Sequence, residues 1–233
     1  MKKLYEKSEI WFAVGWIMIY VIVMGNMRAN FGESSVLSLL ALILIAGAIT
    51  VFIFKNNLSE KYGLERGNLK GCLFFIPFVL LSFVNLIAGV KMHYTGSDMV
   101  TALLLMALVG YVEELIFRGL LFKAMEKDNL RSAVIVTALT FGAGHIINLF
   151  TGQIAFETLL QIVYAVAIGF AFVAAFIKTG SLIPCIVTHS LVDMTSLFSG
   201  EFSRTMDILI SVVITLVMVI YGCWLLKEKK LNE

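Results

Sequence analysis

Long, nearly unbroken runs of apolar residues limit what this chain can fold into more than any other feature. A run of about 18 or more such residues is long enough to cross the hydrocarbon core of a bilayer as a helix. Eight spans can be drawn on this basis, at approximately 9–26, 36–54, 70–90, 98–121, 132–150, 155–177, 182–199 and 206–226. The sequence therefore predicts an all-α fold, a polytopic membrane helix bundle with about eight transmembrane helices.

The composition supports this class and indicates a single domain. Hydrophobic residues make up 60% of the chain and charged residues 15%, against about 25% charged in a typical soluble domain. A net charge of +2 carried by scattered basic residues argues against nucleic-acid binding. Because no Gly/Ser-rich linker or repeat divides the chain, we expect one bundle over 1–233. Its parts are N-terminal helices at 1–97, a core at 98–200, and a last helix with a basic tail at 201–233.

The Lys and Arg residues between the spans predict the orientation. Alternate connections, starting from the N-terminus, carry 14 of these residues, and the other connections carry 3, namely Arg28, Lys91 and Arg204. Cytoplasmic loops of membrane proteins are enriched in Lys and Arg. We therefore expect both termini in the cytoplasm. The short, Lys-rich chain with few long loops is typical of a protein of the bacterial plasma membrane.

The segment "ALVGYVEELIFRGLLF" (107–122) places Glu113, Glu114 and Arg118 inside a predicted span. On insertion scales, placing one of the costliest charged side chains at the centre of a transmembrane helix costs about 2.5–3.5 kcal/mol of free energy. Glu114 and Arg118 are four residues apart with the acid on the N-terminal side, which is the favourable order for an ion pair on one helix face. Glu113 points about 100° away. We predict a structural Glu114–Arg118 pair and a chemical role for Glu113.

Two further spans carry polar groups at an overlapping depth. His145 lies in the segment "FGAGH", and His189 and Asp193 lie one helical turn apart in "THSLVD". Ionisable groups within a membrane normally face the bundle interior and pair with one another. We therefore expect these side chains to meet Glu113 in the middle and cytoplasmic half of the membrane.

Three motifs, in this order, resemble those of the CPBP family. They are Glu-Glu-x-x-x-Arg (113–118), Phe-x-x-x-His (141–145) and His-x-x-x-Asp (189–193). This family contains the intramembrane CAAX-type proteases and bacteriocin-processing proteins, also called the Abi family, including the Rce1-type prenyl-protein endopeptidases. The resemblance covers roughly residues 98–200, which would then be the catalytic core.

The resemblance implies an intramembrane endopeptidase that cuts a membrane-associated peptide or protein tail. Glu113 would be the general base, and His145, His189 and Asp193 would position the water and stabilise the oxyanion. We expect Phe141 to pack beneath the site and the catalytic cavity to be reachable from the cytoplasmic half. The expected partners are the substrate and the lipid bilayer, and nothing in the sequence indicates an oligomeric state.

Asn148, one turn after His145, could support that ring or make an ordinary hydrogen bond between helices.

A metal is the open question at this stage. His145, His189, Asp193 and Glu113 could hold Zn²⁺ with a position left for water, but the H-E-x-x-H pattern on one helix is absent. We favour water activation by glutamate without a tightly bound metal. Asp193 stands where CAAX-type members commonly have Asn, and an ionised carboxylate would repel an oxyanion. Asp193 would instead orient His189, ligate a metal, or be held protonated.

Two other functions are compatible with the same residues. A transporter or channel could use the buried Glu, His and Asp side chains to relay protons or bind a cation. A non-enzymatic immunity protein could keep the motifs for folding alone. Replacement of Glu113 discriminates between these functions, because only a peptidase accumulates an uncut precursor.

Overall fold

The computed structural model of the chain describes residues 1–65 and 69–227, and their regular structure is helical apart from an isolated bridge between Val90 and Ser199. The elements are α1 (Lys2–Lys7), α2 (Glu9–Phe31), α3 (Val36–Lys55), η1 (Leu69–Phe75), α4 (Ile76–Ser82), η2 (Phe83–Leu86), α5 (Gly96–Glu114), η3 (Leu115–Phe122), α6 (Lys123–Met125), α7 (Leu130–Gly144), η4 (His145–Thr151), α8 (Ala155–Thr179), α9 (Ile183–Ser196) and α10 (Arg204–Lys227). The predicted all-α bundle is confirmed.

Six helices of the described part are long and apolar enough to cross a membrane. They are Glu9–Phe31, Val36–Lys55, Gly96–Met125, Leu130–Thr151, Ala155–Thr179 and Arg204–Lys227. The spans predicted third and seventh are instead shorter helices, Gly71–Leu86 and α9. The sequence therefore identified every apolar segment but overestimated the length of these two helices.

The short α9 is explained by the way its N-terminal connection folds into the protein. The amide of Leu182 donates to the carbonyl of Gly63 over 2.8 Å, and Leu182 is fully buried. Gly63 has a φ of +65°, and a Cβ atom there would lie 2.5 Å from the carbonyl oxygen of Gly180. Pro184 stands in the first turn of α9, where its missing N–H costs little. The 14 residues of α9 span about 21 Å, less than the hydrocarbon core of about 30 Å.

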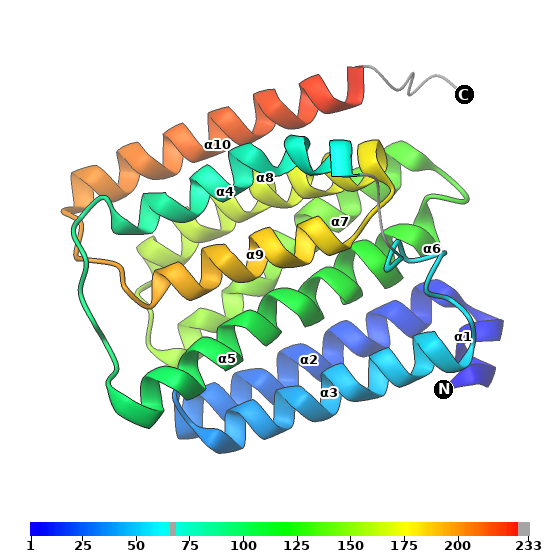
Figure 1. Cartoon of the computed structure of the whole chain (residues 1–233), viewed down its shortest axis with the longest axis horizontal. Helices are drawn as coiled ribbons and strands as arrows, with labels where there is room; N and C mark the ends of the chain where they lie inside the picture. Colours follow the sequence, from blue (N-terminus) through cyan, green and yellow to red (C-terminus); the bar gives the residue numbers. More distant parts are fainter. Residues whose placement is uncertain (66–68, 228–233) are drawn as a thin grey trace.

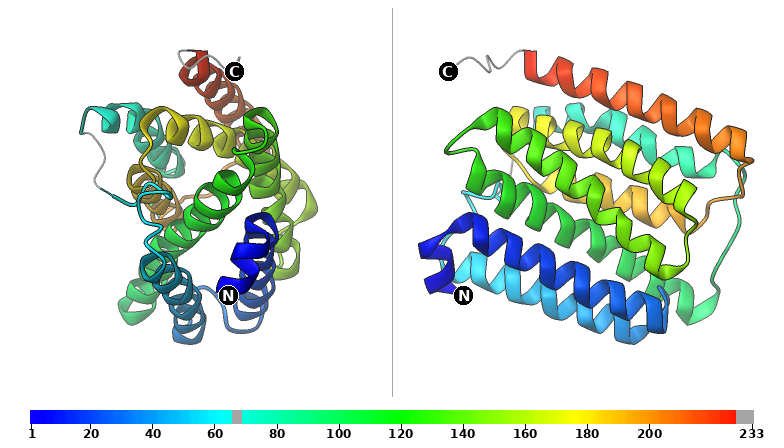
Figure 2. Two further views of the ribbon diagram at one scale, coloured as in Figure 1. Left: turned by 90° about the vertical axis from the view of Figure 1, so that its right-hand side faces the viewer. Right: turned by 180° about the vertical axis from the view of Figure 1, so that it is seen from behind.

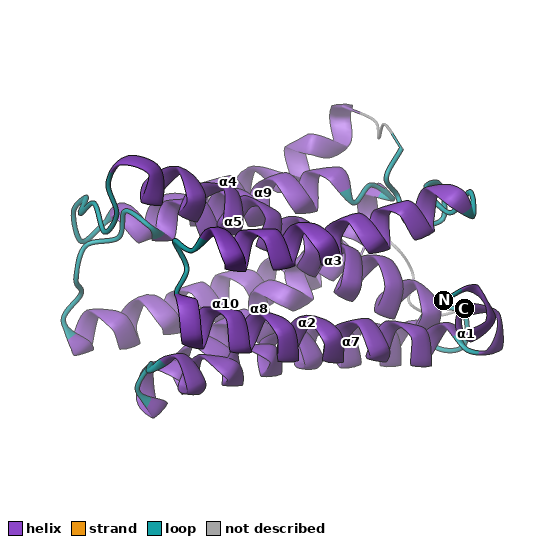
Figure 3. Ribbon diagram, turned by 90° about the horizontal axis from the view of Figure 1, so that it is seen from below, coloured by secondary structure: helices purple, strands orange, loops and turns teal. Residues whose placement is uncertain are grey.

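The helices form two layers, which Figure 3 shows from below. One layer contains α3, α5, α9 and α4 as successive neighbours, and the other contains α2, the α7–η4 helix, α8 and α10. Helix α9 thus lies between α5 and α4, which pack along its sides. A helix too short to span the bilayer is tolerated where protein covers its backbone.

The connections fall at two opposite ends of the bundle (Figures 1 and 2). We call one end the termini face, because α1 and the end of α10 lie there with the connections 56–65, 126–129 and 180–182. We call the other end the distal face, and it carries the connections 32–35, 87–95, 152–154 and 197–203. The N-terminus and the end of α10 at Lys227 lie at the same end of the bundle. Which side of the membrane this end faces stays a prediction.

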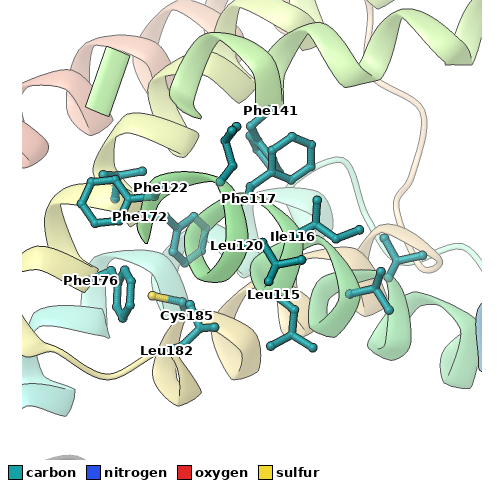
Figure 4. Packing of buried hydrophobic residues seen from close by; sticks show 14 of the residues in the cluster. Leu115, Ile116, Phe117, Leu120, Phe122, Phe141, Phe172, Phe176, Leu182 and Cys185 are labelled. Carbon is teal, nitrogen blue, oxygen red and sulfur yellow. The ribbon is translucent and has the colours of Figure 1, made fainter. Parts of the chain in front are cut away.

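The most deeply buried element is η3, a π-helical segment that continues α5. Every residue of η3 is buried, and Phe172, Leu182 and Cys185 pack around it (Figure 4). A π-helical turn inside an α-helix often occurs at a functional site. Here it follows directly after Glu113 and Glu114, so the two acids stand where the helix is held on all sides.

Candidate active site

The two glutamates at the end of α5 point into different environments. The side chain of Glu114 is fully buried, whereas that of Glu113 is 13% exposed and lines a cavity. This split follows from the turn of about 100° between successive residues of a helix. The two acids therefore point into different surroundings, and the chemical role of Glu113 stays a prediction.

Glu114 is the centre of a buried charge network. Its Oε1 atom accepts from Nη1 of Arg118 at 2.9 Å and lies 2.8 Å from Nδ1 of His189. The Arg118 side chain is fully buried as well, and its guanidinium lies 4.1 Å from the centre of the Phe141 ring. The predicted ion pair is present. Glu114 has a second role that the sequence did not suggest, since its contact with Nδ1 fixes the orientation of the His189 ring.

Glu113 is held by a residue of another helix. The Tyr20 hydroxyl, on α2, donates to Oε1 of Glu113 over 2.6 Å. The other carboxylate oxygen, Oε2, lies 3.8 Å from Nε2 of His189. Hydrogen bonds to ionised groups are shorter and stronger than neutral ones. Tyr20 therefore fixes one oxygen of Glu113 and leaves the other directed towards His189.

His189 and Asp193 share a face of α9, as their spacing predicted. Nε2 of His189 lies 3.6 Å from Oδ2 of Asp193, and this Oδ2 is buried with no hydrogen-bond partner among the described residues. Both this distance and the one to Glu113 are too long for a direct hydrogen bond. A separation above 3.5 Å between polar atoms is typical of groups bridged by a water molecule. Glu113, His189 and Asp193 thus surround a point that suits a small polar molecule.

His145 approaches the same region from the other layer, at the junction of α7 and η4. Its ring packs edge-on against Phe141, 5.7 Å between centres, and Phe141 packs likewise against His189 at 5.6 Å. Phe141 therefore lies between the two histidines and under the site, as expected. Within the described residues His145 makes no side-chain hydrogen bond, which leaves its ring nitrogens available to a substrate.

Among the described residues, no hydrogen bond joins the side chains of Asn148 and His145. Nδ2 of Asn148 donates to Oε1 of Gln161 on α8 over 2.8 Å. Of the two roles considered, the hydrogen bond between helices is thus the one observed.

Two cavities flank these groups. The first has a volume of about 370 Å³ and is lined by Tyr20, Glu113 and Arg28, among others. The second has a volume of about 310 Å³ and lies between α4, α8, α9 and α10. The residues that line both are Phe141, His145, Gln161, His189, Asp193 and Ser196. Three of the four candidate catalytic side chains, His145, His189 and Asp193, therefore lie at the boundary between the two chambers, and Glu113 lines the first. This arrangement suits a substrate that extends to both sides of the reacting bond.

The chambers extend from the middle of the bundle towards the distal face. Glu33 and Gln153, which line the first chamber, and Ser199, which lines the second, belong to connections on that face. The sequence predicted cytoplasmic termini and a cavity reachable from the cytoplasmic half. These two expectations conflict, because the chambers extend away from the termini face.

The possible zinc site was tested against the donor geometry. Among the described residues, no three or more His, Cys, Asp or Glu side chains come together in an arrangement that could hold a metal ion. One nitrogen of His189 is already engaged by Glu114. The set Glu113, His145, His189 and Asp193 therefore does not fit a metal centre as arranged. The expectation of catalysis without a tightly bound metal, and the alternative of zinc, both stay untested.

Sequence reasoning missed Tyr20 and misplaced Arg28. Tyr20 lies in the middle of an apolar helix, and Arg28, expected in a connection, belongs to the last turn of α2 and pairs with Glu33. The sequence did contain one signal for Tyr20, because its hydroxyl is a polar group in the middle of a long apolar helix. A polar group at membrane depth requires a partner. Nothing in the sequence, however, identified that partner as Glu113.

The fold and site together define an integral membrane helix bundle with an acid–imidazole cluster beside buried chambers. Residues 95–195 match the model of a protease family described as type II CAAX prenyl endopeptidase Rce1-like. This match confirms the resemblance carried by the three motifs and covers α5, α7, α8 and α9 except for the last residue of α9. None of the curated proteins compared with the chain matches it.

Proposed function

We propose that this protein is an intramembrane endopeptidase that hydrolyses a peptide bond by means of a water molecule activated by Glu113. The observation that carries the proposal is the placement of Glu113. One carboxylate oxygen is fixed by Tyr20 at 2.6 Å, and the other faces His189 at the wall of a chamber. A general base has to be held within reach of its proton donor in a fixed geometry. The match of the core to a protease family supports the same reaction class.

The proposed reaction needs no group from outside the chain except water and substrate. Water binds between Oε2 of Glu113 and His189, and Glu113 takes one of its protons as the water oxygen bonds to the carbonyl carbon. The tetrahedral intermediate then collapses, the carbon–nitrogen bond breaks, and the proton held by Glu113 passes to the leaving amine. The products are a carboxyl terminus and a free amine, and Glu113 returns to its ionised state.

The developing oxyanion needs a hydrogen-bond donor, because such donors contribute a large share of the barrier reduction in acyl transfer. His145 is suited to this role, since it lines both chambers and makes no competing side-chain hydrogen bond among the described residues. Asp193 is better suited to orienting the His189 ring and the water, because its Oδ2 lies 3.6 Å from Nε2 of His189. We therefore assign stabilisation of the oxyanion to His145 and orientation of the water to Asp193.

The shape of the chambers favours a peptidase over an open channel. A channel requires a path to both membrane faces, but no residue that lines either chamber belongs to the described connections of the termini face, at 56–65, 126–129 and 180–182. Two chambers that meet at a buried acid–imidazole cluster are what an extended peptide requires.

The decisive experiment compares the peptides of cells that carry the wild-type protein with those of cells that carry Glu113→Gln. This replacement keeps the size of the side chain and an acceptor for Tyr20 but removes the base. We expect an uncut precursor to accumulate, and the purified variant to have lost cleavage of that precursor in detergent. The control is Glu157→Gln, in the exposed first turn of α8. Equal cleavage by wild type and Glu113→Gln would refute the proposal.

A further inference from the structure

The entrance of the first chamber is built from the distal face of the bundle. Arg28 from the last turn of α2 and Glu33 from the following connection form an ion pair there. Thr151 and Gln153 contribute from the end of η4 and the connection to α8. These residues come from two separate connections and from the ends of α2 and η4. The entrance is therefore a property of the whole distal end rather than of one loop.

The second chamber leads in the same direction. Ser199 and Phe202, in the connection between α9 and α10, line it together with Asp207 in the first turn of α10. A backbone bridge between Val90 and Ser199 ties this connection to the one before α5. Both chambers thus begin at the cluster of His189 and Asp193 and extend towards the same face.

The distribution of basic residues indicates on which side of the membrane the distal face lies. The N-terminus, the C-terminal end of α10 and the Lys-rich connections lie on the termini face (Figures 1 and 2). The distal face carries Arg28, Lys91 and Arg204, and two of these are paired with acids, Arg28 with Glu33 and Lys91 with Glu201. By the positive-inside rule the termini face is cytoplasmic. The distal face is then the outer face of the membrane.

We propose that the site takes its substrate from the outer side of the membrane. The substrate is a membrane-tethered peptide segment that emerges on that side and enters the chambers in an extended form. The first chamber offers polar partners at its entrance, the Arg28–Glu33 pair and Gln153. The second is walled largely by apolar side chains, including Ile168 and Ile210. A segment with polar residues on one side of the reacting bond and apolar residues on the other matches both chambers. This inference rests on the proposed peptidase function.

The side of access can be measured without knowing the substrate. The exposed Cys72 and Cys223 are changed to Ser, and the buried Cys185 is kept. A single Cys is then introduced by Gln153→Cys at the chamber entrance, or by Glu60→Cys at an exposed position of the termini face. Each variant is treated with a membrane-impermeant thiol reagent, once in intact cells and once in inside-out vesicles.

We expect Gln153→Cys to react in intact cells and Glu60→Cys to react only in inside-out vesicles. We also expect the precursor that accumulates with Glu113→Gln to carry its cleavage region on the outer side. Reaction of Gln153→Cys only in inside-out vesicles would overturn the inference, because the entrance would then face the cytoplasm. Failure to react from either side, with reaction after denaturation, would overturn it equally, because the chamber would then be closed to water. Loss of cleavage by Glu113→Gln in detergent does not depend on the side of access, so the proposed function survives or fails separately.

Discussion

Removal of the Tyr20 hydroxyl tests the part of the active site that the family motifs do not contain. Tyr20→Phe keeps the ring, which is buried on α2, and removes the donor that lies 2.6 Å from Oε1 of Glu113. A hydrogen bond to a charged group contributes about 1.5–3 kcal/mol. If this energy serves to fix the base for the reaction, its loss lowers kcat by about 10- to 150-fold. The KM should change little, because the hydroxyl holds Glu113 rather than the substrate.

The matched control is Tyr111→Phe. The Tyr111 hydroxyl lies 2.7 Å from Oγ1 of Thr50, between α5 and α3, so the same atom is removed from a similar bond between helices. The assay is cleavage of a fluorogenic peptide containing the precursor's cleavage region by protein purified in detergent, with kcat and KM determined separately. Thermal unfolding of each variant in the same detergent reports any general loss of stability.

Tyr20→Phe should lower kcat while Tyr111→Phe leaves it unchanged. A wild-type kcat in Tyr20→Phe would show that Glu113 needs no fixing from α2. An equal fall of kcat in both variants would show that the loss comes from weaker helix packing. Either result would refute the positioning role of Tyr20.

Four further outcomes are expected. Arg118→Met leaves Glu114 buried without its cation and should destabilise the protein by about 3–5 kcal/mol, measured as a fall in the unfolding midpoint that Glu114→Gln partly reverses. Gly110→Ala should lower both stability and cleavage, because a Cβ atom there would lie 2.6 Å from a backbone nitrogen of α9, whereas Gly15→Ala meets nothing within 4 Å and should change neither measurement. Asp193→Asn should retain cleavage, since an amide can still hold water and His189, whereas Asp193→Leu should abolish it in the same peptide assay. Purified protein should carry no stoichiometric metal by elemental analysis and should keep its activity in a chelator, and stoichiometric zinc with chelator-sensitive cleavage would contradict the reading of the donor geometry.

The parts of the site that the sequence predicted are those fixed by local helix geometry. The four-residue spacing of Glu114 and Arg118 and that of His189 and Asp193 place each pair on one helix face, and both pairs lie within 4 Å. The predicted span at 132–150 also places His145 in the same region, because polar groups in a membrane bundle gather in its interior. Periodicity and burial cost were sufficient for these results.

The parts that the sequence did not predict depend on tertiary contacts. The partner of Tyr20 lies 93 positions away in the chain, and no local pattern relates the two residues. The short α9 arises because the connection before it is bonded to Gly63, which likewise joins distant segments. The direction in which the chambers extend is a tertiary property of the same kind. It depends on which helix ends diverge, and helix spacing along the chain carries no information about that.

The contribution of α2 changes how the boundaries of the catalytic unit should be drawn. The family match begins at residue 95, yet Tyr20, Met24 and Arg28 form one wall of the first chamber. A fragment limited to the matched region would lack the donor to Glu113 and one side of the entrance. In the proposed peptidase, the matched region would supply the reacting groups, and α2 would hold Glu113 in place and form part of the binding surface. We therefore expect the residues of α2 near the distal face to determine substrate preference. Replacing Arg28 and Glu33 should change which peptides are cut more than it changes the rate of the chemical step.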